Sequence, residues 1–225
     1  MKFSEIDGLF ESATIKPTFE YIHIILALYL FEKEKEGIGR YRLKEELLIG
    51  SGTTRSLIEK LNKDVNFITV LSDKNKKKGH VLTTAGQAFL NKLKEKIPLL
   101  EVGDLAVLKE ILIESENLYS YYCLIKNSAN HLTNGIKQRD AAIKVDGSGA
   151  TCLVFNGSKL IFPPKAFSDH EMEQMEISDT VQEYLKSSIS KAKYNLERND
   201  VIIIGLGESL EKARLAAMNA ALTLI

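Results

Sequence analysis

The fold of the first half of the chain is decided by residues 40–83, RYRLKEELLIGSGTTRSLIEKLNKDVNFITVLSDKNKKKGHVLT. Two short runs within this stretch have apolar residues at helical spacing, namely Leu43 and Leu47 in the first run and Leu57, Ile58 and Leu61 in the second. A turn that contains glycine, residues 48–52, separates the two runs. Two helices joined in this way have the spacing of a helix-turn-helix motif.

The second part of the same stretch changes to a β pattern. Residues 67–71 and 80–83 predict two strands, and residues 72–79 between them predict the turn of a hairpin. That turn carries four lysines, at positions 74, 76, 77 and 78. A further helix follows from Thr84 and is closed by Pro98. Because a helix pair, a basic hairpin and a closing helix occur in the order of a winged helix-turn-helix domain, we expect such a domain at residues 1–98.

The charges of the chain are unevenly distributed although they sum to zero. Residues 37–100 hold 13 basic and 6 acidic groups, which gives this segment a net charge of +7. Residues 1–36 hold 4 basic and 7 acidic groups, and residues 101–225 hold 13 and 17, so that both are net acidic. Attraction to phosphates depends on the local sign of the charge. Nucleic acid is therefore expected to bind only the middle segment.

The second helix and the hairpin together predict an interface with double-stranded DNA. A recognition helix needs short polar side chains near its N-terminus, and the wing needs flexible cations for the neighbouring phosphates. Arg55 is the candidate for a base contact because its guanidinium can bind guanine with two hydrogen bonds, although Glu59 on the same face opposes this role. The alternative is a solvated lysine-rich turn on a domain that contacts only proteins. The predicted DNA contacts are Ser51, Thr53, Thr54, Arg55, Lys60, Lys74, Lys76, Lys77, Lys78 and His80.

Residues 99–225 mix helical and strand patterns and predict a small, sandwich-like α/β domain, which makes the whole chain α+β. Strands are predicted at 119–125, 150–155, 159–162 and 201–204, and helices at 130–145, 181–189 and 210–224. Residues 105–113 fit a helix capped by Asp104 or a strand, and the helix is favoured. Asn156-Gly157 predicts a type I′ turn, because both residue types tolerate positive φ angles. We expect this domain to bind an effector or to mediate dimerisation.

Two places in this domain are candidates for binding an anion. Residues 201–209, VIIIGLGES, run from a strand into a glycine turn at a helix start, where free N–H groups suit an anion, although a plain capped turn is the alternative. Arg139 and Asp140 interrupt an apolar helix, and as sequence neighbours they are expected to seek other partners, in a structural ion pair or on a ligand. The candidate ligand residues are Arg139, Asp140, Lys144, Gly205, Gly207 and Ser209.

The sequence predicts no catalytic residue, metal ligand or cofactor. The histidines lie on different predicted elements, and no HxxxH or CxxC pattern occurs. Cys123 and Cys152 are expected to be small buried residues in a reducing cytoplasm. The longest apolar run, residues 21–31, is about half of the ~20 residues that a membrane span needs. Because this run has no polar face, we expect a second domain or a second subunit to cover it, and we predict a homodimer.

Several stretches of the chain resemble known proteins. Residues 52–61, followed by KGHVLTTAG at 78–86, resemble winged-helix regulators, in which a basic tip and Leu-Thr lead from the wing into the last helix. More specific are GIKQRDAAIKV at 135–145, GAT at 149–151, residues 155–163 and DVIIIG at 200–205. Together they resemble a family of uncharacterised archaeal proteins that join an N-terminal winged helix to a C-terminal domain of unknown function (number 4443). The resemblance spans nearly the whole chain and implies a transcriptional regulator, but it supplies no catalytic or ligand residues.

The sequence therefore predicts a cytoplasmic, homodimeric transcriptional regulator that binds double-stranded DNA and whose C-terminal domain senses a small anionic effector or mediates assembly. The competing function is an enzyme or metabolite-binding protein that acts on a small anionic ligand near Gly205 and Gly207.

Overall fold

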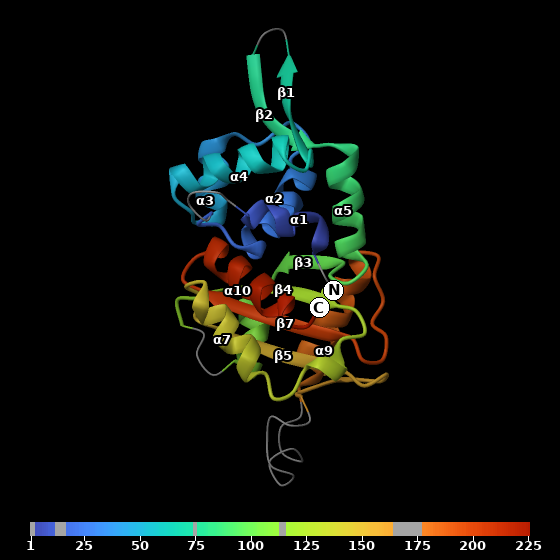
Figure 1. The fold of residues 1–225 in the computed structure, drawn as a ribbon. Coiled ribbons are helices and arrows are strands. Elements are labelled where there is room, and N and C mark those ends of the chain that lie inside the picture. Colours follow the sequence, from blue (N-terminus) through green and yellow to red (C-terminus); the bar gives the residue numbers. More distant parts are fainter. Residues whose placement is uncertain (1–2, 12–16, 74–75, 113–115, 164–176) are drawn as a thin grey trace. The chain divides into compact units, whose positions relative to one another are not determined.

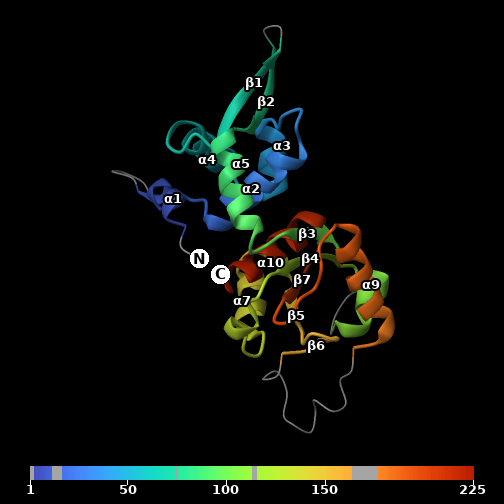
Figure 2. The ribbon, with the colours of Figure 1, turned by 90° about the vertical axis from the view of Figure 1, so that its right-hand side faces the viewer.

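The computed structural model describes residues 3–11, 17–73, 76–112, 116–163 and 177–225, with residues 72–73 and 76–78 described by their backbone alone. The chain divides into two compact units, Met1–Leu93 and Lys94–Ile225, close to the boundary after residue 98 that the sequence predicts. Both units combine helices with strands, and every strand pair among the described residues is antiparallel (Figures 1 and 2). The α+β class is therefore confirmed.

The first unit, which we call unit 1, is a group of helices with one hairpin, and Figure 1 shows the hairpin projecting away from those helices. Its elements are α1 (Ser4–Asp7), η1 (Gly8–Phe10), α2 (Tyr21–Lys33), α3 (Arg40–Leu47), α4 (Ser51–Lys63), β1 (Ile68–Asp73), β2 (Lys76–Leu82) and α5 (Thr84–Lys94). Helix α2 is buried around most of its circumference, at Ile22 and at residues 24–31, as the apolar run predicts. No helix within the described ranges is long and apolar enough to cross a membrane.

The turn between α3 and α4 is tight because its first residue bends the chain sharply. Leu48 has a φ of 53°, in the left-handed region, and Gly50 is the N-cap of α4. Within α4, Leu57, Ile58 and Leu61 are buried as predicted.

The hairpin that follows α4 is anchored at its base by a third segment. Ile38 and His80 exchange two backbone hydrogen bonds, with N···O distances of 3.0 and 2.9 Å. A Cβ atom on Gly79, which has a φ of 119°, would lie 2.6 Å from the carbonyl carbon of Ile38. Only glycine therefore allows Ile38 to approach the hairpin this closely.

The second unit, which we call unit 2, contains one five-stranded sheet in the order β3-β4-β7-β5-β6. The strands are β3 (Leu99–Val102), β4 (Tyr119–Ile125), β5 (Gly149–Phe155), β6 (Leu160–Ile161) and β7 (Val201–Gly207). The helices are α6 (Leu105–Leu108), η2 (Lys109–Ile111), η3 (Ala129–His131), α7 (Ile136–Lys144), α9 (Asp179–Lys191) and α10 (Leu210–Leu222). Figures 1 and 2 show α7 and α10 on one face of the sheet and α9 on the other.

The core under α9 is made by alternate residues of three adjacent strands. Tyr122 and Leu124 of β4, Ile202 and Ile204 of β7, and Leu153 and Phe155 of β5 form one cluster with Val181, Leu185 and Ile189 of α9. The opposite sheet face carries both cysteines, because Cys123 and Cys152 are each paired in register with Ile203. They are thus two strands, about 10 Å, apart, which is too far for a disulfide. Burial raises the pKa of Cys152 to about 12 and also raises the pKa of Cys123, so both are structural residues.

The helix before β5 and the turn after it differ from those that the sequence predicts. The helix expected at 130–145 begins only at Ile136, because Gly135 has a φ of 83° and interrupts the helical backbone. The hairpin turn after β5 is not of type I′, since Gly157 has a positive φ (101°) and Asn156 does not. Instead, Asn156 Oδ1 accepts hydrogen bonds from the backbone N–H groups of Ser158 and Lys159, each with an N···O distance of 2.9 Å.

Strand β7 continues through both glycines that the sequence assigns to a turn. A Cβ atom on Gly205 would lie 2.2 Å from the backbone nitrogen of Ala217, and one on Gly207 would lie 2.5 Å from that of Ala213. Helix α10 therefore packs directly on the backbone of β7, and its alanine-rich composition permits the same close approach from the helix side. The glycines serve helix packing.

Replacing Gly205 with alanine should destabilise unit 2, because α10 must move away from the sheet to admit the methyl group. We expect the free energy of unfolding in urea to fall by about 2 kcal/mol or more. The matched control is Gly8→Ala, since Gly8 has helical backbone angles and nothing lies within 4 Å of a Cβ atom at that position, and its effect should stay within about 0.5 kcal/mol. Equal stability of the two variants would contradict the packing role of Gly205.

Candidate functional site

Helix α4 presents a polar face away from the core of unit 1. Ser51, Gly52, Arg55, Glu59 and Lys63 are exposed along it. Arg55 forms no ion pair with another residue in the described part of the chain. Lys63 Nζ lies 2.6 Å from Glu59 Oε1, and this hydrogen bond lowers the pKa of the Glu59 carboxyl. The acidic group that opposes Arg55 as a DNA contact is therefore paired with a cation on the same helix.

Three of the predicted contacts on α4 are less available than the sequence suggests. Thr54 is fully buried, and its hydroxyl donates to the carbonyl of Gly50 at 2.9 Å, so that its assignment as a DNA contact is wrong. The hydroxyl of Thr53 lies 2.6 Å from that of Thr18. Lys60 Nζ lies 3.4 Å from the carbonyl oxygen of Glu11 and 3.6 Å from Asp64 Oδ2. Ser51 and Arg55 remain as the exposed contacts of the first turns.

Three of the hairpin lysines lie on a strand, where the sequence predicts a turn. Residues 76–78 belong to β2, and Lys76 and Lys77 pair with Asp73 and Ser72 of β1. The side chains of these lysines, and all of Lys74, lie outside the described part of the structure. His80 is half-buried, and its backbone is paired with Ile38.

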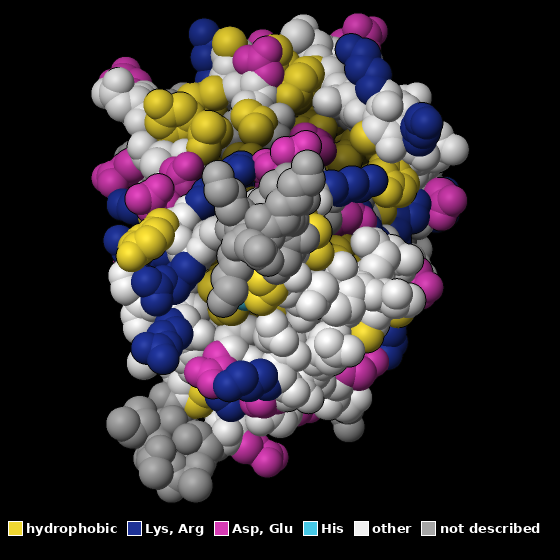
Figure 3. Space-filling view, turned by 90° about the horizontal axis from the view of Figure 1, so that it is seen from above, with side chains coloured by type: hydrophobic (Ala, Val, Ile, Leu, Met, Phe, Trp, Pro, Cys, Tyr) yellow, Lys and Arg dark blue, Asp and Glu magenta, His cyan; other side chains and the backbone are white. Residues whose placement is uncertain are grey.

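Some of the basic side chains that the structure describes in unit 1 are paired with acidic ones. Arg42 Nη2 lies 2.6 Å from Glu34 Oε1, and Lys92 is paired with Glu5. Figure 3, seen along the hairpin, shows Lys and Arg side chains interspersed with Asp and Glu. Part of the net charge of +7 is thus balanced by acids from the first 36 residues, which the segment-by-segment count could not show.

The structure also corrects the predicted anion-binding residues of unit 2. Arg139 Nη2 lies 2.9 Å from Asp140 Oδ1, so these neighbours do pair, through two exposed side chains at the start of α7. The buried polar residue of α7 is Gln138. Its side-chain amide nitrogen donates to Thr223 Oγ1 at 2.7 Å. Lys144 is exposed at the end of α7.

The glycine segment of β7 offers no cradle for an anion. Gly205 and Gly207 lie under α10, as described above, and Ser209 caps α10 by accepting a hydrogen bond from the backbone N–H of Lys212. Lys212 Nζ in turn lies 2.8 Å from Glu208 Oε2. Gly205, Gly207 and Ser209 therefore have structural roles in connecting β7 to α10, as the alternative interpretation of the sequence expects.

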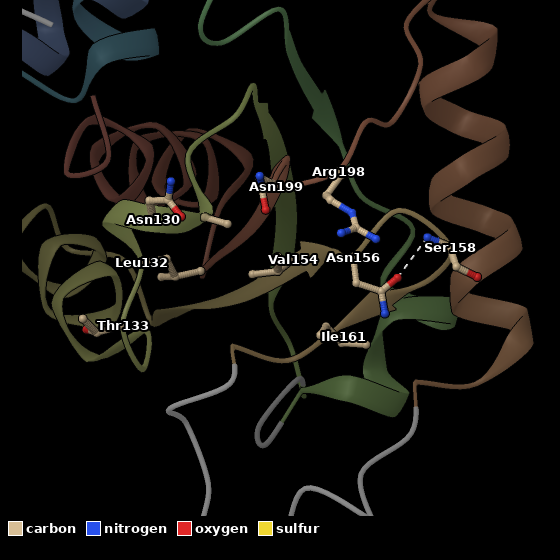
Figure 4. Close-up of a pocket in the computed structure, with 10 residues that line it drawn as sticks. Asn130, Leu132, Thr133, Val154, Asn156, Ser158, Ile161, Arg198 and Asn199 are labelled. Atoms are coloured by element: carbon tan, nitrogen blue, oxygen red, sulfur yellow. Dashed lines mark hydrogen bonds between the residues drawn. The ribbon is translucent and has the colours of Figure 1, made fainter.

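A pocket of about 680 Å³ lies elsewhere in unit 2, among residues that the sequence does not single out as ligand-binding. It is lined by parts of 129–133, Val154, the 156–158 turn, Ile161 and residues 198–199. Figure 4 shows the polar side chains of Arg198 and Asn156 on one side of the pocket, Asn130 and Thr133 on the other, and Val154 between them. Among the described residues, no group of three or more His, Cys, Asp or Glu side chains could hold a metal ion.

Comparisons with known proteins gave a family-model match within each unit. Residues 117–224 match the model of a family described as a domain of unknown function (DUF4443), and residues 20–88 match that of the PH0730-like, N-terminal domain. The hypothetical protein PH0730 from Pyrococcus horikoshii OT3 has a solved structure that is 23% identical, with a TM-score of 0.62 over 92% of this chain and 93% of that chain. This similarity shows a shared fold. A comparison with curated proteins gave no match.

Proposed function

We propose that unit 1 is a winged helix-turn-helix domain that binds double-stranded DNA, and that the chain is a transcriptional regulator. The observation that supports this most strongly is the exposed Arg55 on α4, which has no ion-pair partner among the described residues, because the next element along the chain is a hairpin that bears three consecutive lysines. In this arrangement α4 is the recognition helix and the β1–β2 hairpin is the wing.

The start of α4 is suited to a phosphate. Its N-cap is Gly50, and no side chain accepts hydrogen bonds from its first N–H groups. Ser51 and Gly52 are exposed, and the positive end of the helix dipole lies at this end of α4. A phosphate bound there would hold α4 against the groove, so that Arg55, one turn further along, reaches the base edges.

The proposal is tested by the salt dependence of binding to a duplex of about 20 base pairs, followed by fluorescence anisotropy. If Lys76, Lys77 and Lys78 each displace one counterion, the logarithm of the binding constant should fall with the logarithm of salt with a slope of about −2.7. Arg55→Gln removes a base contact and should weaken binding by about 1–3 kcal/mol with little change of the slope. Arg139→Gln on α7 removes the same charge elsewhere and should leave the affinity unchanged. No binding at low salt, or binding without salt dependence, would refute the proposal.

The homodimer stays a prediction of the sequence. In a homodimer bound to DNA, the two copies of α4 should lie about 34 Å apart, which is one turn of the duplex. A solution mass measured by light scattering decides between one chain and two.

A further inference from the structure

The pocket of unit 2 has the volume of a small-molecule site. Its volume of about 680 Å³ lies within the roughly 300–1,000 Å³ range that such sites occupy. Leu132, Val154 and Ile161 give it an apolar surface. The segments that line it are up to about seventy positions apart in the sequence, so it exists only because the sheet brings them together.

The charged side chain among the described residues that line the pocket is basic. Arg198 is a cation of the lining, the described lining residues include no Asp or Glu, and the amides of Asn130 and Asn199 are added donors. No described residue forms an ion pair or hydrogen bond with the Arg198 side chain. A guanidinium presents several N–H donors in a planar fork that matches a carboxylate or a phosphate. An anionic group is therefore the natural partner of this cation.

Gly157 makes room for that guanidinium. A Cβ atom at this position would lie 3.1 Å from Arg198 Nε and 3.5 Å from Nη2. The φ of 101° at Gly157 also disfavours any residue with a side chain. The turn after β5 therefore leaves space over its backbone for the Arg198 side chain.

Two of the loops that carry polar lining residues, the loop after β4 and the loop before β7, are held together by a buried carboxylate. Asp200 is fully buried; its Oδ2 accepts from Lys126 Nζ at 2.6 Å and from the Glu197 backbone N–H at 2.8 Å, and its Oδ1 accepts from the Asn127 N–H at 2.9 Å. These bonds join residues 126–127 to residues 197–200.

A second set of bonds completes this support. The carbonyl of Asn199 accepts from the N–H groups of Ser128 and Ala129 at 2.9 and 3.0 Å, and Asn199 itself has a φ of 72°. Its own N–H donates to the carbonyl of Phe155 at 2.9 Å. The lining of the pocket is thus held in place before any ligand arrives, which lowers the entropic cost of binding.

We propose that this pocket binds a small organic anion, with Arg198 pairing with its carboxylate or phosphate group and the surface of Leu132, Val154 and Ile161 contacting its apolar part. This site differs from the anion-binding positions that the sequence predicts at α7 and β7. The proposal does not depend on DNA binding by unit 1, and the two can fail separately.

Thermal unfolding of the full chain with three ring compounds tests the proposal. Benzoate and phenyl phosphate carry the two candidate anionic groups, and benzamide is the neutral control. At concentrations about ten times above the dissociation constant, the anion that fits should raise the melting temperature by about 3 °C, whereas benzamide should not. A shift with benzoate alone identifies a carboxylate ligand, and a shift with phenyl phosphate alone identifies a phosphate. No shift with either anion, or an equal shift with benzamide, overturns the proposal.

Variants then assign the shift to the pocket. Arg198→Gln should weaken the binding of the active anion about 10-fold or more, because a charged hydrogen-bond partner is lost. Arg198 is exposed, so this variant should fold. Arg139→Gln, which removes an arginine from α7, should keep the full shift, and Gly157→Ala should reduce it by displacing the guanidinium. A shift that survives Arg198→Gln unchanged, or that is lost equally in Arg139→Gln, overturns the proposal.

Discussion

Reversing three charges of the hairpin together, through Lys76→Glu, Lys77→Glu and Lys78→Glu, should weaken binding to duplex DNA by at least about 100-fold at ~50 mM salt. Each lysine that contacts a phosphate releases a counterion, and a glutamate in its place adds repulsion. The slope of the binding constant against salt, on logarithmic scales, should become shallower by about 2.7, which is the share of these three lysines. Anisotropy titrations at four or more salt concentrations measure both quantities.

The control for this variant makes the same change of net charge in unit 2. Lys109, Lys137 and Lys191 are all exposed there, and their joint replacement by glutamate should leave the slope within the error of the wild-type value. If this control weakens DNA binding as much as the hairpin variant does, the effect belongs to total charge, and the assignment of the hairpin as a wing is wrong.

Asp200→Ala should lower the free energy of unfolding of unit 2 by about 3 kcal/mol, because it leaves a buried polar cluster without its common acceptor. Lys126 loses its buried partner, and the backbone N–H groups of Asn127 and Glu197 lose their acceptor. The estimate is at the lower end for a broken buried ion pair, since the side chain of Lys126 is 23% exposed. Urea denaturation followed by circular dichroism measures the loss.

A second lysine–carboxylate pair on the same unit provides the comparison. Lys212 and Glu208 lie 2.8 Å apart, but the Glu208 side chain is 72% exposed. Glu208→Gln should therefore change the stability by less than about 0.5 kcal/mol. Similar losses in the two variants would show that burial of Asp200 contributes nothing and would remove the proposed support of the pocket.

Features that repeat locally along the chain were predictable. The apolar spacing of Leu57, Ile58 and Leu61 is contained within one helix, and it gives both the helix and its buried face. The same holds for Val181, Leu185 and Ile189 of α9. Strand β3 was missed because it has only four residues, too few for a pattern to emerge.

Features that depend on a neighbour from a distant part of the chain were not predictable. Gly205 has the local signature of a turn, and only the approach of α10 shows that it is a packing site within a strand. Thr54 is polar and lies near a helix start, but its hydroxyl bonds to the backbone of Gly50 and it is buried. Polarity alone therefore could not separate it from Ser51.

The pocket was missed for the same reason. Most of its lining comes from short loops whose residues are common in turns. The position of Arg198 depends on the space over Gly157 and on the loop that Asp200 holds, and neither can be seen in the sequence. Asn156-Gly157 was a visible signal, but it was assigned to turn formation alone. Counting charges along the sequence gave the correct net charge of each segment. It could not show that Arg42, in the basic segment, pairs with Glu34, in the acidic one.

Mapping the backbone amide signals of the isotope-labelled full chain by nuclear magnetic resonance, with and without duplex DNA at low salt, tests the central claim most directly. DNA should shift the signals of the start of α4, residues 51–56, and of the hairpin, residues 70–80, and these shifts should disappear as salt is added. Shifts confined to residues 94–225, or none at saturating duplex, would contradict DNA binding by unit 1.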